Sequence, residues 1–415
     1  MNMHVPRILT AGEKALVAAM ETAAPALPGN AAVAERRMIA RARMQADGLP
    51  TRKVEAWHYT DMRTLLRGLP QAGPAVDAAA LVDGATVLAA TDAGVSVLAN
   101  VPGASIASMA PAFATGAAAA LMPAGDRADV VGLVSTALTS TGFDLAIADG
   151  TTLEAPLQMD FGSSAHLHAL NRVTVGAGAS GVLIERSHGA GLSSLVTHLT
   201  VADGADVTYV ILQEKADDAL HLARIVISLG AKAKLMLVLV NTGGGLVRQE
   251  IDVAVAGEHS DFRLRGMNLL SGKRHVDVTM TVLHSVEHTS STEFIRNVAT
   301  GEAKGVFQGQ IRVAAQAQKT DARMACNTLI LSDEAEFLAK PELEIFADDV
   351  ACGHGATVAE INRDHLFYLM ARGVSAAEAR AMLVRAFVSE LLDEIENEPL
   401  HDALQGRLTD WLMAH

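Results

Sequence analysis

The feature that most constrains the fold is the stretch from Phe143 to Gly355, in which short β-prone runs follow one another with no credible helix between them. Most runs are bounded by Gly, Asp, Asn or Ser, which are typical turn residues. Regular alternation of strands and helices is therefore excluded for this part of the chain. The runs are Val182–Ile184, Val207–Leu212, Arg224–Leu229, Lys234–Val240, Glu250–Val255, Phe262–Arg265, His275–Leu283, Gly305–Val313, Thr328–Leu331 and Glu342–Phe346.

Two architectures fit such a series, a large antiparallel sandwich and a parallel β-helix. Hairpin signals are few, Asp203-Gly204 being one, which counts against the sandwich. No strict short repeat is visible, which counts against a solenoid. The pattern alone leaves both open, with a lean towards the β-helix. Aromatic residues make up only 4% of the chain, so the core depends on small branched side chains, which suit ladders of stacked strands.

Helical patterns flank the β-rich stretch. Ala31 to Ala46 has amphipathic spacing and is followed by stop signals at residues 47–50. Near the other end, Asp364 to Arg372 predicts a helix that Gly373 would cap. Ser375 and Glu378 have capping-box spacing and open a further helix that ends before Pro399. Its apolar stripe is predicted to consist of Ala379, Met382, Leu383, Ala386, Phe387, Leu391 and Ile395.

That stripe is wide, and two short terminal helices bury little, so part of it is expected to contact another protein. Between Leu69 and Gly142 the chain is rich in Ala, Gly and Pro, with strands predicted at Thr86–Ala90 and Val95–Ala99. With 415 residues, two or three domains are expected. We place them at 1–143 (helical and mixed), 144–357 (the β core) and 358–415 (helical).

Charge and cysteine content limit the partners and the cellular compartment that the protein is expected to have. The net charge of -14 disfavours binding to nucleic acid, whose phosphates such a surface repels. Two cysteines cannot form a disulfide framework, which favours a reducing cytosol. Residues 1–14 lack the apolar run of a signal peptide, and the strongest apolar strip, Leu235 to Val240, is too short to span a bilayer. We expect a cytoplasmic protein without a membrane segment.

Motifs of common enzymes are missing. The glycine runs at 176–178 and 243–245 lack the Lys-Ser/Thr ending of a phosphate-binding loop, and neither opens a helix. There is no Gly-x-Ser-x-Gly nucleophile elbow and no Cys-x-x-Cys pair. The carboxylate clusters that β-helical enzymes use would not be visible as a sequence motif. Enzymatic activity is therefore not excluded, although no residue pattern indicates it.

The sequence feature that most directly suggests metal binding is Cys352-Gly353-His354. Alternate residues of a strand face the same side, so the thiol and the imidazole could approach one iron or zinc ion. Two ligands do not complete such a site, since four is the usual number. From the spacing alone, a packed cysteine beside a hydrogen-bonded histidine is the better interpretation.

Other candidate pairs are weaker. His166 and His168 have the same strand spacing, and His284 and His288 lie four residues apart in a β-like region. Structural or surface roles are the better interpretation for both pairs. Cys326 precedes an apolar run, which favours a packing role.

A long ordered series of motifs resembles the SufB/SufD family of iron–sulfur cluster assembly proteins. The form Cys352-x-His354-Gly-Ala-Thr-Val is more similar to the SufD branch than to the SufB branch, as is Glu55-x-Trp57-x-Tyr59-Thr. His58 stands where an Arg is common, and Cys326 stands where SufB has a cysteine. The segments that carry the resemblance are 52–60, 275–277, 305–313, 317–322, 329–333, 341–345, 348–358 and 367–373.

This resemblance implies a right-handed parallel β-helix flanked by helical terminal domains. It implies a complex with SufB through the β-helix and with the ATPase SufC through the C-terminal helices, about Phe367 to Ile395. It also implies a nascent iron–sulfur cluster, or iron, held transiently and shared with SufB. His354 then becomes the first choice as an iron ligand and Cys352 the second, with no nucleotide site on this chain.

Alternatives remain at this stage. A β-helical carbohydrate-active enzyme would bind sugars through acidic residues in a groove. A pure interaction scaffold would share the partners but have no metal role, so it would differ only in the effect of changing Cys352 and His354. Self-association of the isolated chain into a homodimer stays open.

Overall fold

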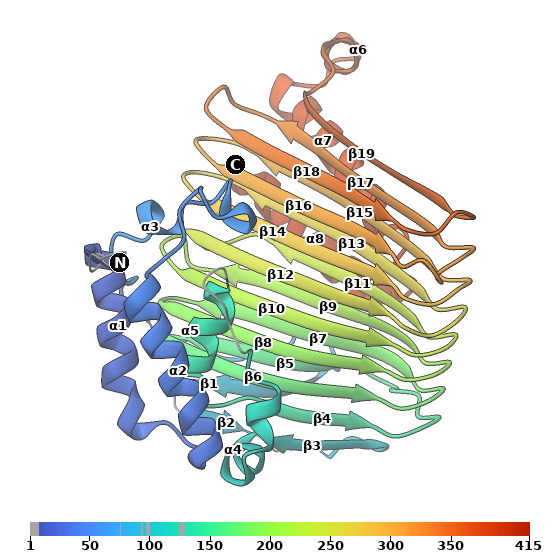
Figure 1. Ribbon diagram of the computed structural model, residues 1–415. Helices are drawn as coiled ribbons and strands as arrows, with labels where there is room; N and C mark the ends of the chain where they lie inside the picture. The colour runs from blue at the N-terminus through green and yellow to red at the C-terminus, as the bar shows by residue number, and fades with distance from the viewer. Residues whose placement is uncertain (1–7, 75, 93, 97–99, 124–128) are drawn as a thin grey trace.

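The computed structural model shows two long parallel sheets wound by one continuous chain into a β-solenoid of about eight turns (Figure 1). The structure describes residues 8–74, 76–92, 94–96, 100–123 and 129–415. Helices lie at both ends of the sequence and cover parts of the two sheets. The parallel β-helix predicted for the core is therefore confirmed, and the antiparallel sandwich is wrong.

Successive strands alternate between the sheets. In order along the first sheet the strands are β19 (Ala351–Glu360), β17 (Asp321–Ile330), β15 (Ser290–Ala299), β13 (Asp261–Leu270), β11 (Lys234–Asn241), β9 (Asp206–Lys215), β7 (Ser180–Gly189), β5 (Leu157–Ser163), β1 (Thr86–Thr91) and β2 (Gly94–Ser96). The second sheet contains β18 (Glu336–Ile345), β16 (Lys304–Val313), β14 (His275–His284), β12 (Leu246–Val255), β10 (Leu220–Leu229), β8 (Leu192–Val201), β6 (His166–Val175), β4 (Phe143–Ile147) and β3 (Ala104–Ser108).

The pairing explains why no repeat is visible in the sequence. Asp206, Lys234, Asp261, Ser290, Asp321 and Ala351 occupy equivalent places on successive strands, and they are 28, 27, 29, 31 and 30 residues apart. The period drifts because the turns differ in length. The coils have in common only the alternation of inward and outward side chains, and many residue types are compatible with that alternation.

The strand β11 illustrates how the core is built. Leu235, Leu237 and Leu239 point into the solenoid and are fully buried there. The alternating positions Val238 and Val240 are also buried, but under helices on the outside of the sheet. Both faces of this strand are covered, so its sequence is a continuous apolar run rather than an alternation.

The N-terminal helices cover the second sheet. The predicted helix at 31–46 is confirmed as α2 (Ala31–Asp47), which Asn30 caps and which ends at Gly48 with a φ of 59°. Its neighbour α5 packs on β6, β8 and β10, with every residue buried. The remaining elements are α1 (Ala11–Ala23), η1 (Ala24–Ala26), η2 (Glu55–Trp57), α3 (Met62–Leu65), α4 (Ala110–Thr115), η3 (Ala117–Ala120) and α5 (Val130–Leu138).

The mixed region contributes strands to the solenoid. The run Thr86–Ala90 lies in β1, which pairs in parallel with β5. The run Val95–Ala99 is matched by β2 only as far as Ser96, and residues 97–99 lie outside the described residues. Because β1 and β3 join the two sheets, the strands begin before residue 144, and the last strand ends at Glu360.

Two of the three C-terminal helices, α7 and α8, lie against the first sheet, and α6 projects beyond the end of the solenoid (Figure 1). They are α6 (Arg363–Ala371), α7 (Ala376–Leu392) and α8 (Glu398–Ala414). Gly373 follows α6 with a φ of 89°, and the Ser375 hydroxyl accepts a hydrogen bond from the Glu378 N–H at 3.3 Å, as predicted. The prediction that Pro399 follows the helix opened by Ser375 is confirmed, because α7 ends at Leu392. Pro399 itself lies in the first turn of α8, a further helix that was not predicted.

The predicted apolar stripe of α7 is confirmed in part, since Ala379, Leu391 and Ile395 are buried. Val384, Val388 and Leu392 face the sheet and α8, whereas Met382 is 48% exposed and Ala386 is exposed. The helix is apolar on more than one side, so spacing alone does not identify the face that packs. Most of the covering is supplied by this chain, and the side of α7 around Met382 stays open.

Candidate functional site

The solenoid ends in two terminal strands, β18 and β19, one in each sheet. Each is hydrogen-bonded to a strand on one side only within the described part of the chain. Almost all of β19 is exposed. Large apolar side chains accompany this edge: Leu338, Ile345, Phe346 and Val358. Unpaired backbone groups and exposed apolar side chains together make this end a surface suited to another strand-bearing protein.

Cys352 and His354 both lie on β19, as the sequence predicted. They are two residues apart, so their side chains face the same side of the strand. Cys352 is half-buried and packs against the core of the solenoid, whereas His354 is exposed. In the register with β17, Cys352 stands beside Ala322 and His354 beside Met324.

The environment of Cys352 keeps its thiol protonated. Burial raises the pKa of Cys352, a hydrogen bond involving the Ala322 backbone lowers it, and the charges of Asp321 and Glu293 raise it further. A metal ion must displace that proton to bind the sulfur. The imidazole of His354, by contrast, faces solvent.

The donor set on this chain is incomplete. Among the residues that the structure describes, no group of three or more His, Cys, Asp or Glu side chains is arranged to hold a metal ion. Cys352 and His354 offer two ligands of types that bind iron, on an edge open to a second molecule. Such an arrangement can complete a site only with ligands from elsewhere.

Cys326 does not join them. It lies on β17 beside Ala356, is fully buried, and its sulfur accepts a hydrogen bond from the Asn297 Nδ2 at 3.3 Å. Burial raises the pKa of Cys326 to about 12. A thiol with that pKa is neither a nucleophile nor a ready ligand at neutral pH, which supports the packing role expected from the sequence.

Among the described residues, neither of the other histidine pairs belongs to a group of three or more side chains that could hold a metal ion. His166 is exposed while His168 is buried, and the His168 Nδ1 contacts the Ser194 hydroxyl at 2.8 Å. Both ring nitrogens of His284 contact hydroxyls, those of Thr289 and Ser291. Hydroxyl groups therefore occupy the Nδ1 of His168 and both ring nitrogens of His284.

A buried charge cluster that sequence reasoning missed fixes the N-terminal segment to the solenoid. Trp57 is fully buried, and the Arg248 guanidinium lies over its ring at 4.4 Å from the centroid. Arg248 Nη1 is 2.7 Å from a carboxylate oxygen of Asp277, to which the Thr60 hydroxyl also donates. The concentration of aromatic residues near Trp57 was visible, but no spacing connects it to Arg248, which lies far along the chain.

Fold and site together define a class of protein: a parallel β-solenoid with helical ends and an open terminal edge that carries a thiol and an imidazole. None of the described helices has the length and apolarity needed to cross a bilayer. The model of the SufBD core domain of the SUF system for FeS cluster assembly matches residues 160–387, more than half of the chain. The chain belongs to the SufBD family.

Relatives agree with this assignment. An iron–sulfur cluster assembly SufBD family protein of Synechocystis is 32% identical over 216 residues, covering 52% of this chain and 47% of the relative. The iron–sulfur cluster assembly protein SufD of Escherichia coli is 30% identical over 241 residues, covering 51% and 57%. A chloroplastic protein of Arabidopsis thaliana is 29% identical over 214 residues, covering 51% and 45%. The chain spans about half the length of the curated relatives it matches.

Proposed function

We propose that this chain is a SufD-like, non-catalytic scaffold subunit of a cytoplasmic SufB–SufC–SufD complex that assembles nascent iron–sulfur clusters. The observation that carries the proposal is the open edge strand β19 with Cys352 and His354 on one side of it, in a chain of the SufBD family. An edge that offers two ligands and exposed apolar side chains fits a site completed by a partner.

The partner at this edge is SufB, the other branch of the family. A second β-solenoid could extend both sheets across β18 and β19, because a parallel edge strand presents unpaired backbone donors and acceptors. Phe346 and Val358, which are 64% and 50% exposed, would be buried by that contact. The cluster or iron is cargo at this boundary, with His354 as the first ligand from this chain and Cys352 as the second.

The partner at the C-terminal helices is the ATPase SufC. Phe367 and Tyr368 of α6 and Met382 of α7 are exposed large apolar side chains in the predicted contact region. The opposite side of α7 packs on β13 and β15, two strands of the sheet that ends in β19. Movement of the helices by the ATPase would therefore reach the sheet that carries the ligands, while ATP hydrolysis itself belongs to SufC.

The test is a pull-down of tagged full-length chain from native cytosol with identification by mass spectrometry. The wild type should recover SufB and the ATPase. The double variant Phe367→Asp with Met382→Asp should lose the ATPase and keep SufB, because both side chains are exposed and neither supports the core. The variant Met38→Asp, at an exposed methionine of α2, is the control and should keep both partners.

Recovery of neither partner by the wild type would contradict the proposed complex. Recovery of both by the double variant would contradict the assignment of the ATPase contact. A scaffold without a metal role would recover the same partners, and only the Cys352 and His354 variants separate it from this proposal.

A further inference from the structure

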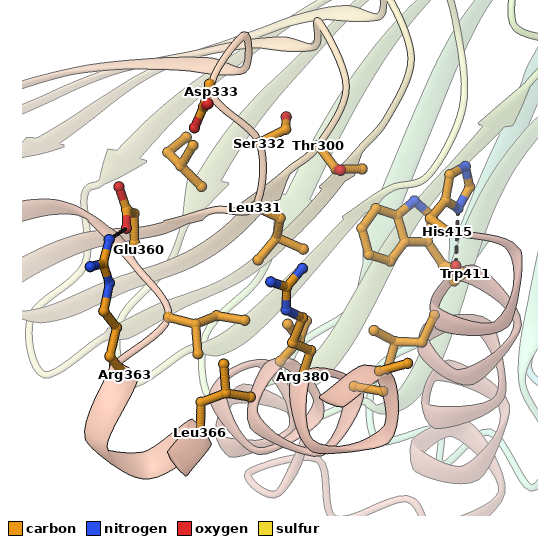
Figure 2. Close-up of a pocket in the computed structure, with 16 residues that line it drawn as sticks. Thr300, Leu331, Ser332, Asp333, Glu360, Arg363, Leu366, Arg380, Trp411 and His415 are labelled. Atoms are coloured by element: carbon orange, nitrogen blue, oxygen red, sulfur yellow. Dashed lines mark hydrogen bonds and ion pairs between the residues drawn. The ribbon is translucent and has the colours of Figure 1, made fainter. Parts of the chain in front are cut away.

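A cavity of about 770 Å³ lies between the first sheet and the C-terminal helices. Figure 2 shows it enclosed by the turn after β17, the segment that joins β19 to α6, and the inner sides of α7 and α8. Its volume is within the range of pockets that hold small molecules. It adjoins the end of β19 at Glu360 and includes Arg380 of α7, but every residue that lines it belongs to this chain.

Arg380 places a positive charge in this cavity. It extends from α7, and its guanidinium stands in the middle of the space, on the side facing Thr300 and Ser332 (Figure 2). It forms no ion pair with any described residue. Two arginines of the sheet, by contrast, form ion pairs with glutamates of the α7 region: Arg265 with Glu394, and Arg296 with Glu390.

The second arginine of the cavity, Arg363, is at the rim. It pairs with Glu360 at 3.5 Å, and both side chains are largely exposed. An exposed pair of this kind contributes little and is easily exchanged for another partner. Arg380, which is itself exposed, is thus the arginine of the cavity without an ion-pair partner among the described residues, and Arg363 lies at the rim.

The walls of the cavity combine apolar side chains with polar ones, among them Thr300, Asp333, Glu360 and His415. Leu331, Leu366 and Val384 line the space, and the ring of Trp411 forms one side of it (Figure 2). Trp411 is 6% exposed, and its indole Nε1 is buried without a hydrogen-bond acceptor in the described parts of the chain. A buried donor without an acceptor is uncommon in a native fold and is expected to be satisfied by something bound nearby.

We propose that this cavity binds a small organic anion with a flat apolar body and one carboxylate or phosphate group. Arg380 binds the anionic group, for which a guanidinium offers paired donors. The apolar body lies against Leu331, Val384 and Trp411, and a ligand oxygen can accept from the indole N–H. Inorganic phosphate alone would leave the apolar walls unfilled, and a neutral apolar molecule would leave Arg380 without a counter-charge.

Such a ligand has a structural consequence. Its contacts come from the end of β17, from α6 and from α7 and α8, so binding would hold the helices against the sheet. This goes beyond the proposed function and does not depend on it, because the cavity is formed by this chain alone.

The test is isothermal titration calorimetry on the full chain with three probes: 2-naphthoate, 1-naphthyl phosphate and the neutral 2-naphthalenemethanol. At least one anion should bind with a stoichiometry of one, and the neutral probe should bind at least about tenfold more weakly. The two anions separate a carboxylate ligand from a phosphate ligand. Absence of saturable binding by both anions would overturn the proposal, as would equal binding of the neutral probe.

Variants locate the site. Arg380→Gln removes the charge, and Ala381→Leu fills part of the cavity, so each should weaken the anion at least about tenfold. Arg385→Gln is the matched control, an exposed arginine of the same helix outside the cavity, and should leave binding within about twofold of wild type. Circular dichroism confirms that each variant is folded. Unchanged binding by either folded variant would overturn the assignment to this cavity.

Discussion

Arg248 shows what a single side chain does for this fold. It is buried against the ring of Trp57 and beside the carboxylates of Asp277 and Glu250. Its removal would leave the buried Asp277 without its cation. We expect Arg248→Met to lower the free energy of unfolding by about 3–5 kcal/mol, measured by urea denaturation.

A matched exposed arginine supplies the comparison. Arg263 pairs with Asp261 at 2.8 Å, but its side chain is 47% exposed. Arg263→Met should change the free energy of unfolding by less than about 1 kcal/mol. Equal losses from both variants would contradict the account of Arg248 as the buried link between the N-terminal segment and the solenoid.

Glu293 makes stability depend on pH. It is fully buried inside the solenoid on β15, and burial raises its pKa to about 8. Between the pKa of an unfolded glutamate, about 4.5, and about 8, the folded state holds a proton that the unfolded state has lost. Stability should therefore fall as the pH rises through this window, because the folded state binds more protons.

The variant Glu293→Gln removes this titration. We expect the wild type to lose on the order of a few kcal/mol across the window relative to Glu293→Gln, measured by urea denaturation at a series of pH values. The difference between the two proteins should be smallest near pH 5. A difference that stays constant from pH 5 to pH 8 would show that Glu293 is ionised in the folded protein.

Among the elements, the inner corner of the first sheet is held by a ladder of amides. The Asn241 Nδ2 donates to the Asn268 Oδ1 at 2.8 Å, and the Asn268 Nδ2 donates to the Asn297 Oδ1 at 2.7 Å. All three side chains are buried, so each depends on its neighbours for hydrogen bonds.

Breaking the ladder in its middle should be costly. We expect Asn268→Ala to lower the free energy of unfolding by about 1–3 kcal/mol, because donors and acceptors on both sides lose their partner. Ser228→Ala, at an exposed outward position of β10, should change it by less than about 0.5 kcal/mol. Thermal and urea unfolding measure both, and a loss no larger than that of the control would count against the ladder.

Local signals predicted elements where a cap or a single amphipathic face was present. Asn30 and Gly48 fix the ends of α2, and both effects are local in sequence. The packed face of α7 was predicted only in part, because the buried residue Val384 and the exposed residue Met382 are both apolar. Only the position of β13, β15 and α8 decides between them, and that information is not local.

Some strands were also missed because the contacts that stabilise them are not local in sequence. Ser290–Ala299 and Leu192–Val201 were not predicted, since both carry several polar residues. In the solenoid these polar side chains are satisfied by neighbours one coil away, as Ser193 is by the His221 Nδ1 at 2.9 Å. A spacing between coils that varies from 26 to 32 residues hides such partners from inspection of the sequence.

At the scale of the whole molecule, the sequence pattern left both the sandwich and the β-helix open, and the family resemblance decided between them. It also directed attention to Cys352 and His354, which the structure places together at the open end of the solenoid. Arg380 and Trp411 carry no motif, and they meet only because α7 and α8 pack side by side on the sheet. The candidate edge site was therefore predictable from sequence, and the cavity was not.

The central claim is that this chain supplies an iron ligand at a shared edge. The most direct measurement is anaerobic iron–sulfur cluster reconstitution on the purified complex, followed by absorbance and by iron and sulfide content. His354→Ala should leave the complex assembled and lower the cluster yield at least about fivefold, because losing a first ligand typically costs a large share of metal affinity. His166→Ala, at an exposed histidine of β6 far from the edge, should give the wild-type yield. A normal yield from His354→Ala in an intact complex would contradict the account.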